Sequence, residues 1–384
     1  EIPVLAAGGD LKNSAAYGDG TTVYLAPYAG DLENPLTFER FEKTVERILE
    51  LYKVSPERIV CDMHPGYHSR QWALSLDIPE KIEVQHHHGH ILSVMAEQGL
   101  EETLGVSFDG TGYGTDGTIW GGEILYADRY GFKRIGSLLP FRLPGGEAAV
   151  RRPGRTAYSL LRRYSGSPPP AGLVPDEELG IIEGMVETGL NSPVTTSAGR
   201  LFDAAAALLK IVDTVGYEGE GPIKMEWAAS RYVRDRGLDP GRPGQYGLIP
   251  AEAAGFELIP VSGSGGFPGE MPEGWSVPSF VLDPLPVLKY ILEETGGRSS
   301  GRTGELSFRF HEACAGGIAC AVSRAAEETG SRTVCLSGGV FQNMLLRDLL
   351  LPLLRDRGFR VFLNRRVSPG DGGLALGQAY IRRI

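Results

Sequence analysis

Two apolar runs that lead directly into glycine-rich turns restrict the fold of this chain more than any other feature of its sequence. Residues 104–109 end at Asp109, and four glycines follow within the next eight residues. Residues 333–336 lead into a Ser-Gly-Gly turn, and a helical pattern follows at 341–350. In open α/β folds, ligands bind beyond the carboxyl ends of the strands. The sequence therefore predicts an α/β fold with a ligand site at these two turns.

Elements of the same kind occur in both halves of the chain, which predicts a duplicated α/β architecture. Hydrophobic periodicity predicts further strands at 4–7, 22–25, 58–62, 83–85, 121–125 and 360–363. It predicts further helices from the histidine run to 97, after 373, and at 38–52, 154–163, 177–188, 199–210, 225–236, 280–294 and 306–328. For a chain of this length, we expect an N-terminal lobe at 1–140 and a C-terminal lobe at 141–384.

Composition and charge disfavour several classes of protein. The formal net charge is −10, which disfavours a protein whose main task is to grip nucleic acid. No apolar run reaches membrane-spanning length and no signal peptide is visible, so we expect no membrane partner. The four cysteines form no CxxC pair, which favours the reducing cytoplasm over a disulfide framework. The chain begins with Glu1 rather than Met, so we expect an upstream segment.

Four histidines fall within the five positions 86–90. His86 and His90 are four residues apart, so on a helix their imidazoles share a face and could hold one metal ion. A polar start to a helix explains an isolated HxxxH pair equally well. His87 and His88 lack this spacing and would project elsewhere, towards substrate or towards groups that support the ligands. Two neutral imidazoles leave a divalent ion short of ligands, so a metal site needs carboxylates from elsewhere in the chain.

Asp109 and Asp371 are the candidate carboxylates, because each lies in an unusual glycine-rich turn. A simple hairpin needs fewer glycines than follow Asp109, so the close approach of a ligand is favoured over a purely turn-forming role. Asp371 lies between two glycines immediately before a helical pattern. It is either a helix N-cap or an anionic ligand held by a stiff turn, with the helix N-terminus free to meet phosphate.

A second group of residues is a candidate nucleotide site. Gly338 and Gly339 match neither a Walker A motif nor GxGxxG. Their backbone N–H groups could still cradle a phosphate, and Asn343 could hydrogen-bond a nucleotide; the alternative is a tight turn that only permits close packing. Asp203 and Glu226 could bind ribose hydroxyls. Each is otherwise explained as an acid on the solvent-exposed face of a helix.

Together these motifs resemble the HypF family of hydrogenase-maturation carbamoyltransferases, in the same order and over essentially the whole chain. The similarity is to the C-terminal domain of that family, which is related to tRNA threonylcarbamoyl-transferase subunits and antibiotic O-carbamoyltransferases. It implies the duplicated two-lobed α/β fold of the sugar kinase/Hsp70/actin superfamily. The motifs that carry it are GGDLKN at 8–13, the HHHGH run, SFDGTGYGTDGTIWGGE, GRLFDAAAALL, SGGVFQN and SPGDGGLALGQ.

The resemblance also implies an activity. Carbamoyl-adenylate, made from carbamoyl phosphate and ATP in an upstream domain, passes to this domain. The carbamoyl group is then transferred to the C-terminal cysteine of the partner HypE, for synthesis of the cyanide ligands of NiFe hydrogenase. The upstream domains of the family are absent from this sequence. We therefore expect an excised domain or one half of a split system, which by itself does not make carbamoyl-adenylate efficiently.

Roles for individual residues follow from the resemblance by position. Metal ligands match at His86, His90 and Asp371, and a further acidic residue of the metal site matches at Asp109. Nucleotide-binding positions match at Asp203, Glu226, Gly338, Gly339 and Asn343. Mixed histidine and carboxylate ligation suits iron or zinc, whereas nucleotide phosphates bring magnesium. A thiolate acceptor needs no internal nucleophile, so the metal-site residues are the best catalytic candidates.

Three other functions are compatible with parts of this pattern. One is a subunit that modifies tRNA with threonylcarbamoyl, which the charge of −10 and the forms SFDGTGYG and GDGGLALG disfavour. Another is a sugar or acetate kinase of the same superfamily, whose chemistry has no role for HxxxH completed by two aspartates. The third is a nucleotide-gated scaffold without transfer activity. It predicts ATP binding but no carbamoyl transfer when the adenylate and the acceptor cysteine are both supplied.

Overall fold

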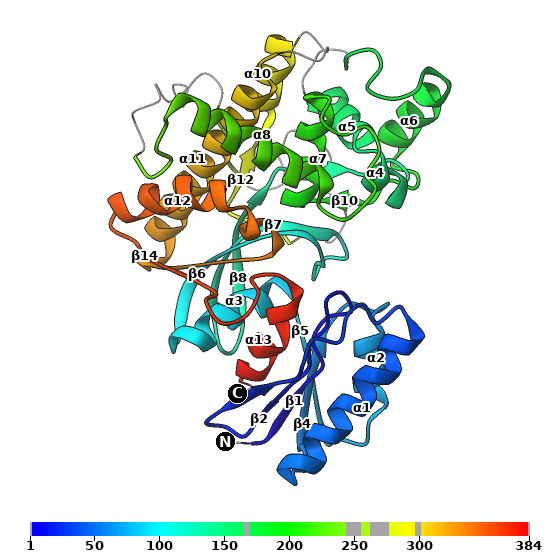
Figure 1. The fold of residues 1–384 in the computed structure, drawn as a ribbon, viewed down its shortest axis with the longest axis vertical. Helices are drawn as coiled ribbons and strands as arrows, with labels where there is room; N and C mark the ends of the chain where they lie inside the picture. The colour runs from blue at the N-terminus through cyan, green and yellow to red at the C-terminus, as the bar shows by residue number, and fades with distance from the viewer. Residues whose placement is uncertain (1, 165–168, 243–254, 262–275, 296–300, 383–384) are drawn as a thin grey trace.

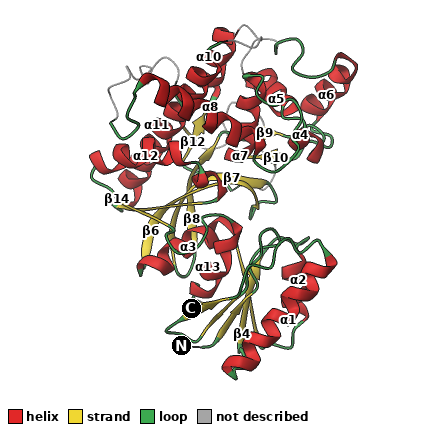
Figure 2. Ribbon diagram, in the orientation of Figure 1, coloured by secondary structure: helices red, strands yellow, loops and turns green. Residues whose placement is uncertain are grey.

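The computed structural model describes the chain except for residues 1, 165–168, 243–254, 262–275, 296–300 and 383–384. The described residues form two β-sheets, one above the other in Figure 1, with a pair of helices between them. Figure 2 shows that the other helices cover the outer faces of these sheets. None of the helices in the described ranges is both long and apolar enough to cross a membrane.

The smaller sheet has five strands in the order β3-β2-β1-β4-β5. The first three are antiparallel to one another, whereas β4 and β5 run parallel to β1. Two helices, α1 and α2, connect β3 to β4 and β4 to β5. The bounds are β1 Val4–Ala6, β2 Ala16–Gly18, β3 Val23–Leu25, α1 Pro35–Tyr52, β4 Arg58–Asp62, α2 His68–Ser75 and β5 Glu80–Val84.

The larger sheet contains the order β8-β7-β6-β13-β14 and is extended at β8 by β12 and β11. A short pair, β9 and β10, joins it through β7. The bounds are β6 Glu102–Tyr113, β7 Ile119–Asp128, β8 Phe132–Leu138, β9 Phe141–Arg142, β10 Val194–Thr195, β11 Glu257–Pro260, β12 Phe280–Asp283, β13 Thr333–Ser337 and β14 Arg360–Leu363.

The two sheets repeat one plan. In the larger sheet, β6, β7 and β8 are antiparallel, β13 is parallel to β6, and β14 is parallel to β13. This is the order and direction of β1 to β5 in the smaller sheet. The last strand of each plan is followed by a helix, α3 (His86–Gln98) after β5 and α13 (Leu374–Tyr380) after β14. The duplicated two-lobed α/β fold predicted from the sequence is therefore confirmed.

Strand alternation builds separate cores on the two faces of each sheet. Leu5 and Ile59 of the smaller sheet face α1 and α2, whereas Val4 and Val60 face α3. Side chains from both sheets meet around α3 in one core, so α3 is buried between the two lobes. The largest core lies beyond the other face of the larger sheet. It involves helices among α4 Glu147–Arg151, α5 Gly154–Tyr164, α6 Asp176–Thr188, α7 Ala198–Leu208, α8 Glu220–Arg236, α10 Leu285–Thr295, α11 Thr303–Thr329 and α12 Met344–Asp356.

The structure corrects three of the predicted elements. The helix predicted at 280–294 begins only with α10, because Pro284 excludes a helical conformation for the residue before it and Phe280–Asp283 pairs with β8 and β11 instead. The helix predicted at 341–350 begins only at Met344, because residues 341 and 342 belong to a 3-10 turn, Gly339–Gln342, and α12 then extends to Asp356. The strand predicted to end at Asp109 continues through a bulge to Tyr113.

Strands β1 to β5 belong to the smaller sheet, and the strands from β6 onward belong to the larger sheet. Strands β6, β7 and β8 lie within the predicted N-terminal lobe, 1–140, yet they pair with β12 and β13 of the predicted C-terminal lobe, 141–384. The reason is that the second set of five strands begins with β6, β7 and β8 and is completed only by β13 and β14, which come much later in the chain. The division of the chain into two folding units at residue 140 stays a prediction.

Candidate metal centre and nucleotide pocket

The paired histidines lie in the first turn of α3, immediately after β5. The helix begins at His86 because the side chain of Gln85 caps it, accepting a hydrogen bond from the backbone N–H of His88 at 2.9 Å. The four-residue spacing then brings Nε2 of His86 to within 3.2 Å of Nε2 of His90. Both side chains are buried, at 1% and 0% exposure.

Asp371 reaches these histidines because α13 packs very closely on α3. A side chain at Gly377 would overlap the carbonyl oxygen of Gly89 and lie 2.8 Å from the backbone nitrogen of Ser93. The two glycines therefore allow the helix backbones to touch. Asp371 opens the 3-10 turn Asp371–Gly373 that leads into α13, so this contact fixes its position over the start of α3.

Asp109 comes from the larger sheet, at the bulge of β6. Its Oδ2 lies 2.9 Å from Nε2 of His90. Its Oδ1 accepts hydrogen bonds from the backbone N–H groups of Gly110 at 2.8 Å and Gly339 at 3.0 Å. The two glycine turns that the sequence singled out therefore meet at one carboxylate. At Gly112, a Cβ would lie 2.9 Å from the His86 ring, so glycine there allows β6 to approach α3.

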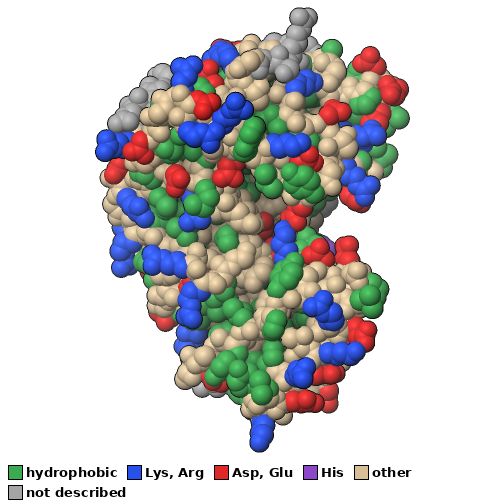
Figure 3. Space-filling model, viewed as in Figure 1, with side chains coloured by type: hydrophobic (Ala, Val, Ile, Leu, Met, Phe, Trp, Pro, Cys, Tyr) green, Lys and Arg blue, Asp and Glu red, His purple; other side chains and the backbone are tan. Residues whose placement is uncertain are grey.

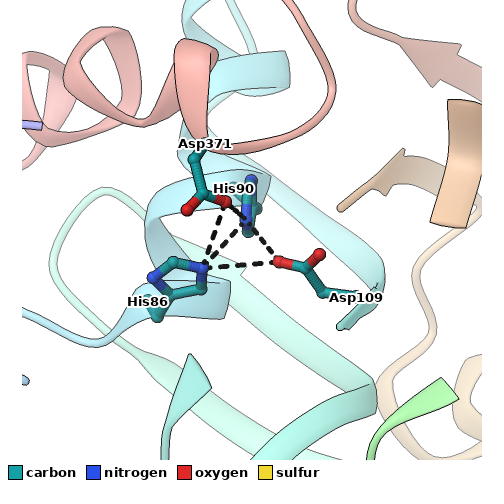
Figure 4. Close-up of side chains that lie close together, drawn as sticks. All are labelled: His86, His90, Asp109 and Asp371. Carbon is teal, nitrogen blue, oxygen red and sulfur yellow. Dashed lines mark hydrogen bonds and ion pairs between the residues drawn. The ribbon is translucent and has the colours of Figure 1, made fainter. Parts of the chain in front are cut away.

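Figure 4 shows His86, His90, Asp109 and Asp371 pointing toward one another. Their candidate ligand atoms all lie within 4.8 Å of each other. Nε2 of His86 is 3.4 Å from Asp109 Oδ2, and each histidine Nε2 is 3.7 Å from Asp371 Oδ1. Ligand atoms in a tetrahedral zinc site are separated by about 3.3 Å, from metal–ligand distances of about 2.0 Å. The donor types and spacings of this cluster therefore fit a first-row transition metal.

A third aspartate, which the sequence did not single out, orients His86. Asp62 is 1% exposed at the end of β4, and its Oδ2 lies 2.7 Å from Nδ1 of His86. This contact favours the tautomer with the proton on Nδ1 and leaves Nε2 with its lone pair towards Asp109 and Asp371. The only sequence signal was an acid at the end of a buried strand.

Burial and charge act in opposite directions on the ionisable groups of the cluster. Burial by itself lowers the pKa of His86, but Asp62, Asp109 and Asp371 outweigh it, and the net pKa lies well above the ordinary value. Burial raises the pKa of Asp109, but His86 and His90 outweigh it and hold that pKa well below the ordinary value. Burial raises the pKa of Asp371 to about 6. Positive charge in the cluster therefore stabilises the buried carboxylate of Asp109, as a bound cation would.

Replacing Asp62 by asparagine is expected to weaken metal binding. The amide has the size of the carboxylate but no negative charge, so it holds the His86 ring less firmly and lowers its basicity. We expect a loss of metal affinity of about 10- to 100-fold, with unchanged affinity for AMP. Metal analysis after dialysis against a graded chelator, with isothermal titration of AMP, measures both. Equal metal retention in the variant and the wild type would contradict the role given to Asp62.

The neighbouring histidines are outside the cluster. Nε2 of His88 lies 2.9 Å from the carbonyl oxygen of Asp128, on the far side of the helix. His87 is fully buried, with its Nδ1 3.8 Å from Glu123 and its ring beside Trp120. Burial lowers the pKa of both rings, that of His88 to about 4.

A cavity of about 260 Å³ adjoins the cluster and includes Asp109 and Asp371 in its walls. Lys12 reaches it from the loop after β1 and forms an ion pair of 2.8 Å with Glu218, so the pair joins the two lobes at the cavity. The remaining walls come from the glycine turns, α7, α8 and the segments beside them. They are Gly110, Gly199, Arg200, Phe202, Gly219, Pro222, Ile223, Glu226, Gly339, Val340, Gln342, Asn343 and Gly370.

Three of the five predicted nucleotide residues line this cavity: Glu226, Gly339 and Asn343. Each already has a partner in the protein. The side chain of Glu226 accepts from the backbone N–H of Met344 at 2.7 Å. The amide of Asn343 accepts from Leu346 at 2.9 Å and lies 2.8 Å from the ring of His311. Asn343 and Glu226 therefore cap the N-terminus of α12.

The other two predicted nucleotide residues, Asp203 and Gly338, do not line the cavity. Asp203 is buried on α7 and pairs with Arg200 at 2.9 Å, and it is Arg200 that lines the cavity. Gly338 has a φ of +100°, and a Cβ there would collide with the backbone of Phe108. Glycine is therefore required at position 338 for the conformation of the turn. The next residue of the turn, Gly339, lines the cavity.

Fold and cluster together define a two-lobed α/β protein with a candidate metal centre at the junction of its lobes. Two family descriptions match the chain: "HypF Kae1-like domain" over residues 1–97, and "Carbamoyltransferase, Kae1-like Domain, second subdomain" over residues 105–378. The second alone spans more than half of the chain, so the chain belongs to the HypF carbamoyltransferase family. The resemblance recognised in the sequence is confirmed.

Curated relatives agree with this assignment. The chain is 33% identical to "Carbamoyltransferase HypF homolog" of Cupriavidus necator, with 99% of this chain and 91% of that protein covered. It is also 33% identical to "Carbamoyltransferase HypF2" of the same organism and 32% identical to "Carbamoyltransferase HypF" of Rhizobium leguminosarum bv. viciae. The chain spans only 46% and 45% of those two proteins.

Solved structures of the family have the same fold. A full-length HypF crystallised in a phosphate- and nucleotide-bound form superposes with a TM-score of 0.82 at 32% identity, over 99% of this chain and 55% of that one. HypF of T. kodakarensis gives a TM-score of 0.79 at 28% identity, over 99% of this chain and 47% of that one.

Proposed function

We propose that this chain transfers the carbamoyl group of carbamoyl-adenylate to the C-terminal cysteine of a HypE-type partner, in the synthesis of the cyanide ligands of NiFe hydrogenase. The observation that carries the proposal is the position of the His86, His90, Asp109 and Asp371 cluster. Two of its four members, Asp109 and Asp371, also line the cavity between the glycine turns. A metal ion and an adenylate bound in these two places would be in contact.

The transfer exchanges one bond for another. The acceptor sulfur forms a bond to the carbamoyl carbon while the bond from that carbon to the phosphate oxygen breaks. AMP leaves with the electron pair, and the thiol proton passes to solvent. A metal held by His86, His90, Asp109 and Asp371 would supply positive charge to polarise the carbonyl and stabilise the leaving phosphate.

The protein supplies binding and orientation for this reaction. Lys12 keeps its positive charge because Glu218, Asp371 and Asp109 together outweigh the effect of burial, so its pKa is raised. It can therefore pair with the adenylate phosphate, as Arg200 can from the opposite lobe. The backbone of Gly339 faces the same cavity. Asp203 and Glu226 would act on the nucleotide through Arg200 and through the α12 cap, respectively, rather than as freely rotating ribose ligands.

The proposal specifies cofactors and partners. The donor set suits iron or zinc at the cluster, and magnesium would enter with nucleotide phosphates. The adenylate would come from an adenylate-forming domain or subunit. The four cysteines are free thiols, three of them buried, which agrees with a cytoplasmic setting. No nucleic-acid partner is proposed, given the net charge of −10.

Supplying the two substrates directly tests this function. We expect the chain to carbamoylate the C-terminal cysteine of the HypE-type partner when carbamoyl-adenylate is provided, and mass spectrometry of the partner detects the product. Formation of carbamoyl-adenylate is not part of the function proposed for this chain. Carbamoyl phosphate and ATP, supplied without the adenylate, should therefore give little product. A partner with that cysteine changed to serine is the control. Robust adenylate formation by this chain alone would contradict the division of labour.

The same experiment separates the alternatives. A nucleotide-gated scaffold would bind ATP but leave the partner's cysteine unmodified even when the adenylate is present. A subunit of the tRNA-modifying type would carbamoylate no thiol and would instead require tRNA as acceptor. Either outcome would overturn the proposed transfer to cysteine.

A further inference from the structure

The turn between β4 and α2 carries polar and aromatic side chains that neither the metal cluster nor the nucleotide cavity uses. It begins at Asp62, whose Oδ1 accepts the backbone N–H of His64 at 2.8 Å while its Oδ2 holds His86. The backbone N–H of Gly66 donates to Nδ1 of His64 at 3.1 Å, and that of Tyr67 donates to the His64 carbonyl at 3.2 Å. The same aspartate therefore fixes both this turn and a candidate metal ligand.

Three rings from this turn and from β6 form a wall, defined here as His64, Tyr67 and Tyr113. The His64 ring stacks on Tyr67 at 4.3 Å and 24°, and meets the edge of Tyr113 at 5.4 Å. Tyr113 belongs to the larger sheet, and its carbonyl accepts from the side chain of Gln85, the residue before His86. The wall therefore spans both lobes beside the start of α3.

The wall is linked to the metal cluster through Asp62 and lies outside the nucleotide cavity. None of its three residues lines that cavity, and all three are partly exposed. Figure 3 shows a notch between the lobes with acidic side chains beside it. The wall lies where the two sheets meet, because His64 and Tyr67 follow β4 of the smaller sheet and Tyr113 ends β6 of the larger sheet.

Tyr67 offers a hydrogen bond at this position. Its hydroxyl has no hydrogen-bond partner in the described part of the chain. Burial raises the pKa of Tyr67 well above its usual value, and Asp62, Asp371, Asp10 and Asp109 raise it further. The hydroxyl therefore stays protonated and lies within electrostatic reach of the cluster carboxylates. Nδ1 of His64 accepts the hydrogen bond from the backbone N–H of Gly66. The neutral His64 ring therefore carries its proton on Nε2, and this Nε2–H is a second hydrogen-bond donor in the wall.

We infer that the His64–Tyr67–Tyr113 wall receives the acceptor, and that the Tyr67 hydroxyl is a positioning residue that hydrogen-bonds the thiol-bearing terminal residue. The inference rests on the proposed function, because it assigns the second substrate of that reaction. Transfer requires the thiol to approach the carbamoyl carbon from a direction that the AMP part of the adenylate does not occupy. The cavity of Lys12 and Gly339 accommodates the nucleotide, and the partly exposed wall, which Asp62 joins to His86, leaves another approach to the acceptor.

Tyr67→Phe tests this role because phenylalanine keeps the ring that stacks on His64 and removes only the hydroxyl. We expect KM for the partner's C-terminal cysteine, and for free cysteine as a minimal acceptor, to rise about three- to tenfold. We expect kcat at saturating acceptor to change less than about twofold, because the hydroxyl takes no part in bond exchange. Hydrolysis of the adenylate by water should be unaffected, so the ratio of transfer to hydrolysis falls. AMP affinity and metal content should equal those of the wild type.

Tyr28→Phe is the matched control, since it removes the hydroxyl of a tyrosine that is 63% exposed and is not part of the wall. It should behave as the wild type does. An unchanged acceptor KM in Tyr67→Phe would overturn the acceptor wall and leave the proposed function intact. A change in AMP affinity as large as the change in KM would also overturn it, because it would place the hydroxyl on the nucleotide side. Absence of any transfer by the wild type would overturn the proposed function and the inference with it.

Discussion

Replacing His86 by alanine should remove the bound metal and abolish carbamoyl transfer while leaving the fold intact. His86 contributes one of four candidate ligands and is the residue that Asp62 orients. Its loss leaves three candidate ligands and also leaves the buried carboxylate of Asp62 without its imidazole partner. Because changing a residue that merely supports a ligand already costs about 10- to 100-fold in affinity, losing the ligand itself should cost at least about 100-fold. Metal analysis of the purified variant, with circular dichroism to check folding, measures this.

Two comparisons make the result specific. His88→Ala removes an adjacent buried imidazole that faces the carbonyl of Asp128 rather than the cluster. It should destabilise the protein without releasing metal from the folded fraction. AMP binding in His86→Ala should survive, because the histidine does not line the cavity. Unchanged metal content in His86→Ala would refute the assigned centre.

Replacing Gly377 by alanine should be among the most destabilising single changes available in this chain. The added methyl group would overlap the carbonyl oxygen of Gly89, and neither helix can retreat without opening the core between the lobes. Forcing a group into such a packed contact costs about 2–3 kcal/mol in the free energy of unfolding. Asp371 should move with α13, so metal affinity should fall as well. Chemical denaturation and metal titration on one preparation report the two effects.

Gly316 provides the matched control for this change. It is also a helical glycine, on α11, but a Cβ there would have nothing within 4 Å. Alanine at Gly316 should be neutral or stabilise the protein by up to about 1 kcal/mol, from helix propensity alone. If Gly316→Ala and Gly377→Ala had equal stability, the close crossing of α3 and α13 would not be the cause, and the account of how Asp371 is positioned would fail.

Elements with a clear local pattern could be predicted, whereas two strands of the larger sheet, β8 and β12, could not. The periodicity at 38–52 and 306–328 predicts α1 and α11, because the apolar face of a helix repeats within the segment itself. Residues 280–283 are as apolar as a buried helix, and only their pairing with β8 and β11 makes them a strand. Strand β8, which no pattern indicated, contains the buried Arg134, whose partner Glu123 lies on β7.

The nucleotide candidates show the same limit at the level of side chains. The sequence indicates Asp203 and Asn343 as polar groups beside glycine turns, but not that each would already be engaged. Asp203 pairs with Arg200, and Asn343 caps the N-terminus of α12. Lys12 and Glu218 are 206 residues apart in the chain, and their ion pair depends entirely on how the lobes meet.

The sequence by itself determined the family, the duplicated α/β plan and the pairing of His86 with His90, because each depends on order or spacing along the chain. A four-residue spacing on one helix sets the separation of two imidazoles whatever surrounds it. The tertiary structure alone decided that Asp62, Asp109 and Asp371 converge on those imidazoles. Three carboxylates from β4, β6 and the start of α13 meet there only because α3 is packed between two sheets and α13 crosses it at Gly89 and Gly377.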